Sequence, residues 1–341
     1  MEIGFDGPGY ITLQRDAILE RMSRFQHRLY LEVGGKFLYD GHAARVLPGF
    51  DPTSKEKIFH ELFDSMDIIF CINYDDMQDN RILGADTTSY IATVVHMLAD
   101  ISDKLGKKPY IACNKCPREW FDPVVEAQIQ QLTSLWYAVY KRYMIPGYPQ
   151  NTEVVLSSTW YGHDEYIPTT AKLVLVTGAA SNSGKMSTCL GQIYHEHEDG
   201  HDAGYAKYET FPIWNIPLEH PINLAYEAAT ADIGDYNMID TFHRAAYGVD
   251  AVNYNRDVDA FVIVSQLASA FLPLDNFTRS YKSPTDMGIS KAGFAITDDA
   301  VCCNASWAEI ARRKTGYEAL VEKGIGEAIW VERCVKLLGK K

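Results

Sequence analysis

The segment KLVLVTGAASNSGKMST, which spans residues 172–188, decides the fold. Its first half is a run of apolar residues, typical of a strand that is buried on both faces of a sheet. Small residues then occupy positions 178–184, and Leu190, Ile193, Tyr194 and His197 follow at helical spacing. Strand, loop and helix thus come in the order that a P-loop requires.

A loop of this kind holds phosphate through backbone amides, and the amino end of the helix adds a favourable dipole. We expect Lys185 to reach the β- and γ-phosphates of a nucleotide, and a hydroxyl just inside the helix to hold Mg²⁺. The residues predicted to contact the nucleotide are Gly178, Ser181, Asn182, Ser183, Gly184, Lys185, Ser187 and Thr188.

Two positions depart from the strict P-loop pattern. Ala179 stands where the pattern has its first glycine, with Gly178 one place earlier. Met186 follows the lysine in place of serine or threonine, so that Ser187 or Thr188 would have to contact the metal. The alternative is a turn of small residues that binds nothing, or only an adventitious anion.

On either side of this segment, patterns typical of strands alternate with patterns typical of helices, which predicts an α/β fold. Apolar runs predict strands at 28–33, 67–73, 108–113 and 139–145, and again at 172–177, 203–207 and 260–265. We expect two doubly wound, mostly parallel sheet units, the second of them P-loop-like. The predicted domains are a Rossmann-like domain at 1–165, a P-loop-like domain at 166–270, and an extension at 271–341 with loops and a helix at 306–322.

Composition narrows the possible partners. The formal charge is −13, with 32 basic against 45 acidic residues, which argues against general nucleic-acid binding. No apolar run is long enough for a membrane helix, and no secretory signal begins the chain. Seven cysteines at irregular spacing fit free thiols in a reducing compartment, so we expect a cytoplasmic protein.

Polar residues are dense between positions 207 and 240, after the strand that follows the P-loop helix. Lys207, with Lys185 and Asp232, is predicted to be catalytic, and Glu209, Asp232 and Asp235 are predicted to hold Mg²⁺. The predicted strand at 260–265 is followed by Gln266, so the metal carboxylate has to come from elsewhere, or the phosphate loop does not support catalysis. The alternative is a solvated loop with turn-forming aspartates.

Asn223, Arg256 and Lys282 stand in polar loop-like segments and are predicted to contact a substrate. For Arg256 and Lys282 the alternative is ordinary turn chemistry. The histidine- and glutamate-rich segment 195–201 resembles a metal cluster, but a solvated helix end explains it better, because it lies where the P-loop helix should end.

Several longer motifs resemble an uncharacterised bacterial family, DUF1846, also called UPF0371. They are LEVGGK at 31–36, HAARVLPGF at 42–50, GKMSTCL at 184–190, YHEH at 194–197, NLAYEAATAD at 223–232, 253–258 and 281–288. The resemblance covers the chain to about residue 313 and implies a cytoplasmic α/β fold without an established activity. Members of the family continue past this C-terminus with a further domain, so we expect either that this domain is absent here or that the chain is a compact relative.

Residues 174–188 and 203–236 are similar in order to ATP-dependent ligases of the P-loop class, such as CTP synthetase and dethiobiotin synthetase. Lys207, Glu209, Asp232 and Asp235 occupy the places of the lysine, the acid and the Asp-rich loop of that class.

The sequence therefore predicts an enzyme that uses ATP or GTP with Mg²⁺ for phosphoryl transfer, or for ATP-dependent ligation of a small phosphorylated or carboxylate substrate. A homo-oligomer is compatible with the sequence. The competing hypothesis is a non-catalytic protein that senses a phosphorylated metabolite. A nicotinamide-dependent oxidoreductase is disfavoured, because no G-x-G-x-x-G motif follows a predicted strand.

Overall fold

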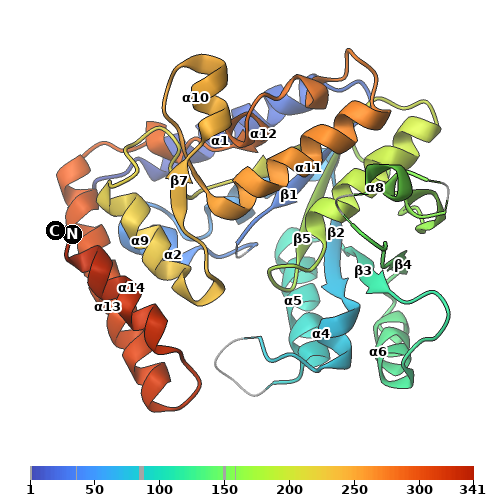
Figure 1. The fold of residues 1–341 in the computed structure, drawn as a ribbon, viewed down its shortest axis with the longest axis horizontal. Coiled ribbons are helices and arrows are strands. Elements are labelled where there is room, and N and C mark those ends of the chain that lie inside the picture. The colour runs from blue at the N-terminus through green and yellow to red at the C-terminus, as the bar shows by residue number, and fades with distance from the viewer. Residues whose placement is uncertain (1, 36, 84–87, 149–150, 158) are drawn as a thin grey trace.

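The computed structural model describes residues 2–35, 37–83, 88–148, 151–157 and 159–341, and Lys36 of the first family motif lies outside them (Figure 1). Within these residues, seven parallel strands form one sheet in the order β4-β3-β2-β5-β1-β6-β9, and β7 and β8 form a small antiparallel pair. The strands are β1 (Arg28–Val33), β2 (Met66–Asn73), β3 (Tyr110–Cys116), β4 (Val139–Tyr143), β5 (Leu173–Gly178), β6 (Ala203–Tyr208), β7 (Asn237–Ile239), β8 (Val252–Tyr254) and β9 (Gly288–Ile289).

The position of β5 corrects the predicted architecture. The chain runs from β1 to β2 and outward through β3 to β4, then returns to place β5 between β1 and β2. The α/β prediction is confirmed, but the prediction of two separate sheet units is wrong, since both halves of the chain supply strands to one sheet. An apolar run shows that a strand is buried, whereas its hydrogen-bonding neighbours are set by long-range packing.

Helices cover both faces of the sheet (Figure 1). Side chains alternate along β5, so that Leu173 and Leu175 join one core and Val174 and Val176 join the other. The α-helices are α1 (Gly7–Ser23), α2 (Gly41–Val46), α3 (Ser54–Glu61), α4 (Tyr74–Gln78), α5 (Tyr90–Leu105), α6 (Pro123–Ser134), α7 (Thr152–Val155), α8 (Lys185–Glu198), α9 (Pro221–Ala229), α10 (Thr241–Tyr247), α11 (Asn255–Phe271), α12 (Pro284–Met287), α13 (Asp299–Glu322) and α14 (Ala328–Leu338). Short 3₁₀ turns are η1 (Phe63–Ser65), η2 (Tyr161–His163), η3 (Ala231–Ile233), η4 (Phe277–Ser280) and η5 (Ala292–Phe294).

The predicted strand at 260–265 lies inside α11 and is therefore wrong. Val258, Phe261 and Val264 are buried at a spacing of three residues, which is a helical repeat that the apolar run conceals. The helix predicted at 306–322 is confirmed as the greater part of α13, which begins earlier, after the Asp298 cap.

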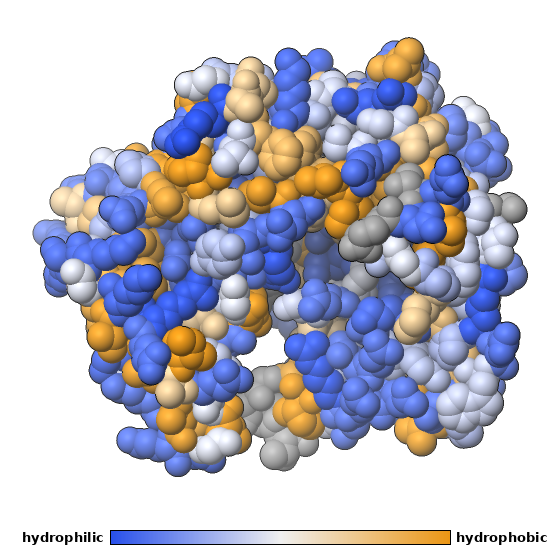
Figure 2. Space-filling view, viewed as in Figure 1, coloured by the Kyte–Doolittle hydropathy of each residue, from blue (hydrophilic) through white to orange (hydrophobic). Residues whose placement is uncertain are grey.

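The carboxyl ends of the strands meet at one edge of the sheet, where Figure 2 shows a hollow in the middle of the face that is viewed. α9, α13 and α14 pack together beside it (Figure 1). Among the described residues, no helix has the length and apolar character needed to span a membrane.

Candidate functional site

The loop between β5 and α8 lies at this carboxyl edge, with Lys185 as the first helical residue. Gly184 precedes it with a φ of +89°, a conformation that side chains disfavour, and an added Cβ would lie 2.6 Å from Asn114 Cγ. At Gly178 an added Cβ would lie 2.2 Å from the hydroxyl oxygen of Ser183. Both glycines thus permit a tight fold of the loop that other residues would prevent.

Two asparagines on neighbouring strands fix the direction of the loop peptides. Asn73 at the end of β2 donates to the carbonyl of Asn182 at 3.4 Å, and Asn114 in β3 donates to the carbonyl of Ser183 at 2.9 Å. The N–H of a trans peptide points opposite to its carbonyl, so the amides of Ser183 and Gly184 point away from β2 and β3. In the described residues no acceptor lies in good hydrogen-bond geometry for any amide of residues 180–187, and a turn at 180–183 brings the amide of Ser183 toward the carbonyl of Ala180.

Lys185 is half-buried and folds back over the loop. Its Nζ lies 3.5 Å from the carbonyl oxygen of Ala180, near the beginning of the loop. The hydroxyl of Thr188, by contrast, is fully buried and donates to Asn114 Oδ1 at 3.1 Å. Ser187, the other hydroxyl predicted to contact Mg²⁺, is half-buried, and its hydroxyl lies near those of Tyr148 and Tyr161.

Sequence reasoning missed one acidic residue beside this loop. β1 is the immediate neighbour of β5, and Glu32 in β1 is in register with Val176. Glu32 is buried and accepts a hydrogen bond of 2.8 Å from the hydroxyl of Tyr205. The sequence does show an acidic residue near the end of the apolar strand β1. Only the strand order of the sheet, however, identifies β1 as the neighbour of β5.

Lys207 lies two strands from β5, at roughly 10 Å, and its ammonium is enclosed by acidic groups. It donates to Asp257 and to the hydroxyl of Tyr254, and its Nζ lies 3.0 Å from Glu209 Oε1. Burial lowers the pKa of Lys207, but Asp257, Glu209 and Glu32 outweigh burial and hold this pKa well above its ordinary value. Lys207 is therefore a fixed cation.

Burial raises the pKa of Glu209 to about 8; Lys207 opposes this rise and Asp257 adds to it. One ammonium cannot fully neutralise both carboxylates, so Glu209 is able to exchange a proton near neutral pH. Glu209 also lines a cavity of about 440 Å³ beside β9, with Arg21, Trp214, His243 and Tyr281 among the other lining residues. The cavity has the size and mixed polarity of a small-molecule pocket.

The predicted metal ligands do not meet in one cluster within the described chain. Asp235 is buried and binds Arg256 through two hydrogen bonds of 2.6 Å. Asp232 is exposed and accepts a 3.3 Å hydrogen bond from the hydroxyl of Tyr317 in α13. Asp232 and Asp235 thus lie in contacts separate from that of Glu209, because the intervening α9 directs the loop toward the C-terminal helices.

The predicted substrate residues are also dispersed. Asn223 is fully buried, accepts from the amide of Ile213, and donates to the carbonyls of Ile213 and Pro217, so its amide holds a loop in place. Arg256 is held by Asp235, and Lys282 is exposed with its Nζ 5.7 Å from the ring centroid of Tyr247.

These features define a class of protein: an α/β protein with one parallel sheet, whose central strand is followed by a glycine-containing loop and a helix. The model of the DUF1846 N-terminal domain, a domain of unknown function, matches residues 3–341, and the chain belongs to this family. The resemblance of its motifs to DUF1846 is thereby confirmed.

Relatives carry the corresponding family name. A UPF0371 protein of Corynebacterium diphtheriae is 44% identical over 321 residues, which are 94% of this chain and 63% of the relative. UPF0371 proteins of Clostridium tetani and Clostridium botulinum are 43% and 42% identical over 320 residues, in each case 93% of this chain and 62% of the relative. This chain thus spans somewhat less than two thirds of their length.

Proposed function

We propose that the loop at residues 178–188 binds the phosphates of ATP or GTP, and that the protein is a phosphotransferase or an ATP-dependent ligase acting at the carboxyl edge of the sheet. The observation that carries the proposal is the fixed direction of the Ser183 and Gly184 amides, which have no acceptor within the described chain. Lys185 supplies the positive charge beside them.

Lys185 would stabilise negative charge on the transferring phosphoryl group. Ser187 and Glu32 are the residues we assign to Mg²⁺; Glu32 takes the place of Asp232 and Asp235, which lie in other contacts. A carboxylate next to the loop strand is where P-loop enzymes hold this ion.

We assign acid–base chemistry to Glu209, whose pKa of about 8 suits proton exchange near neutral pH, and orientation of Glu209 to Lys207. The cavity beside Glu209 would receive the acceptor, a small phosphorylated or carboxylate substrate. A cytoplasmic location fits a protein that uses nucleotide.

Calorimetric titration with a non-hydrolysable ATP or GTP analogue and Mg²⁺ tests the proposal. We expect Lys185→Ala to abolish binding, since it removes the only side-chain cation assigned to the phosphates. Lys172→Ala is the matched control, because Lys172 is exposed just before β5, at the opposite edge of the sheet. Equal affinity in wild type and Lys185→Ala would refute the phosphate site.

The dispersal of Asp232 and Asp235 favours a second candidate, a protein that senses a phosphorylated metabolite without catalysis. A measurement of phosphate release distinguishes the enzyme from the sensor. It uses ATP with Mg²⁺ and a panel of small carboxylates and phosphate esters. Turnover that Glu209→Gln removes supports the enzyme, while binding without turnover in any mixture supports the sensor.

A further inference from the structure

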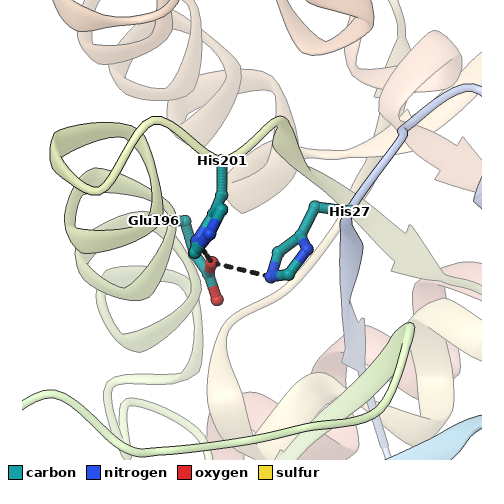
Figure 3. Close-up of side chains that lie close together, drawn as sticks. All are labelled: His27, Glu196 and His201. Atoms are coloured by element: carbon teal, nitrogen blue, oxygen red, sulfur yellow. Dashed lines mark hydrogen bonds and ion pairs between the residues drawn. The ribbon is translucent and has the colours of Figure 1, made fainter.

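Three side chains converge at the amino edge of the sheet, opposite the phosphate loop. Figure 3 shows His27, Glu196 and His201 around one carboxylate oxygen. Glu196 Oε2 lies 3.3 Å from His27 Nε2 and 3.2 Å from His201 Nδ1, and the two imidazole rings stack with their centroids 4.1 Å apart. Segment 195–201 is therefore more than the solvated helix end that its sequence predicts, because Glu196 is fully buried.

The distances match those within a metal coordination shell. A tetrahedral Zn²⁺ with ligands at about 2.0–2.1 Å keeps neighbouring ligand atoms roughly 3.3 Å apart. The separations of Glu196 Oε2 from the two ring nitrogens lie at this value, and the stacked rings have to turn out of parallel before both nitrogens face one ion. Two imidazoles and one carboxylate are also a ligand set that zinc proteins use, with a water in the fourth position.

The second oxygen of Glu196 is already held by the protein. Oε1 accepts hydrogen bonds from Arg28, from the hydroxyl of Tyr30 at 2.8 Å and from the hydroxyl of Tyr166 at 2.9 Å. Such donors fix the orientation of a ligating carboxylate, and a metal would replace the hydrogen bond that the other oxygen makes with His201 Nδ1. Oε2 is directed at the two histidines in this way.

The solvent exposure and the negative charge at the amino edge of the sheet favour binding of a cation. The side chains of His27 and His201 are 36% and 47% exposed, so water is able to reach the fourth position. The turn from α8 to β6 also carries Asp199 and Asp202.

We propose that His27, Glu196 and His201 bind one divalent transition-metal ion, best matched by Zn²⁺. The site joins the residue before β1 to the turn after α8, and it lies roughly 17 Å along α8 from Lys185. The ion therefore clamps the carboxyl end of α8 to the sheet and takes no part at the phosphate loop.

The only other such grouping among the described residues, His220, Asp299 and Cys303, is a weaker candidate. His220 Nδ1 accepts a hydrogen bond from the amide of Ile222, and burial raises the pKa of Cys303 to about 11. A thiol that stays protonated is a poor ligand.

The test uses the full chain, stripped with a chelator and titrated with Zn²⁺ by calorimetry. We expect one Zn²⁺ per chain in the wild type, and an affinity at least about tenfold weaker in His27→Ala and in His201→Ala. His197→Ala is the matched control, because His197 adjoins Glu196 on α8 but packs against Phe271, and it should bind as the wild type does. Tyr166→Phe keeps all three ligands and should lower the affinity about tenfold.

Co²⁺ provides a second readout, since a four-coordinate site gives a strong visible absorption that a hydrated ion lacks. This absorption should appear in wild type and His197→Ala and be lost in His201→Ala. No zinc bound by the wild type, or equal binding in wild type, His27→Ala and His201→Ala, would overturn the proposal.

Discussion

The two ends of α8 hold polar groups in opposite ways. At the amino end, the amides of residues 180–187 have no acceptor within the described chain, and Lys185 reaches only a carbonyl at 3.5 Å. At the carboxyl end, Glu196 is fully buried, and Arg28, Tyr30 and Tyr166 all donate to one of its oxygens. The amino end leaves its amides without a partner, whereas the carboxyl end pairs its buried carboxylate with three donors.

The difference follows from what each end offers. A helix amino end presents N–H groups that an incoming anion is able to satisfy, so leaving them open is tolerated at a solvent-accessible edge. A buried carboxylate has no such freedom, since an unpaired charge away from water is strongly destabilising. The following predictions test this contrast, from the largest expected effect to the smallest.

The carboxyl end should be the more sensitive to loss of its charged group. We expect Glu196→Ala to lower the free energy of unfolding by about 3–5 kcal/mol, because it leaves the buried guanidinium of Arg28 without its partner. Urea denaturation measures the change. The double variant Arg28→Met/Glu196→Met should recover much of the loss, and failure to recover would mean that packing, not charge, dominates there.

Tyr30 and Tyr205 allow a matched comparison of the amino and carboxyl edges of the sheet. Each donates a hydrogen bond of 2.8 Å to a buried glutamate, Tyr30 to Glu196 and Tyr205 to Glu32. Tyr205→Phe should lower the free energy of unfolding by about 1.5–3 kcal/mol, because the Glu32 carboxylate then loses its one hydrogen bond among the described residues. Tyr30→Phe should cost about 1 kcal/mol, since Glu196 keeps Arg28 and Tyr166. Thermal or urea unfolding measures the loss of unfolding free energy in each variant. Equal losses in the two variants would contradict the different numbers of donors assigned to Glu32 and Glu196.

At the amino end, Gly184→Ala should combine strain with a clash. We expect a loss of about 1–3 kcal/mol in unfolding free energy and loss of nucleotide binding, because the new Cβ would meet Asn114 and displace the loop. Gly200→Ala is the control: its φ is +78°, but nothing lies within 4 Å of an added Cβ. It should cost about 1 kcal/mol and leave binding unchanged. Retained binding in Gly184→Ala would show that the loop geometry is not required.

The effect at Glu209 is the smallest when it is taken for a change of one pH unit. Its pKa rises from 4.5 in the unfolded chain to about 8 when folded, so the native state binds the extra proton. The stability that Glu209 contributes is therefore complete at low pH and is lost as pH rises from about 4.5 to about 8. Relative to Glu209→Gln, the wild type should lose up to about 1.4 kcal/mol for each pH unit across that window. Parallel pH curves for the two proteins would refute the raised pKa.

Local periodicity predicted much of the fold, and tertiary packing decided the remainder. The strands at 28–33 and 172–177 and the helix that begins at Lys185 follow from apolar runs and helical spacing, which depend on near neighbours. Residues 260–265 were misread because a helix buried on one face also shows a short apolar run. For the candidate site, the loop could be located from sequence, but its acidic neighbour Glu32 could not, since that requires the strand order.

By itself the sequence determined the family, the α/β class and the strand–loop–helix element at 172–188. Only the tertiary structure decided that β5 inserts between β1 and β2, that Asp232 and Asp235 lie apart from Glu209, and that His27 joins Glu196 and His201. The physical reason is that backbone periodicity is a short-range property. Which strands become neighbours depends instead on how both faces of the whole sheet are buried.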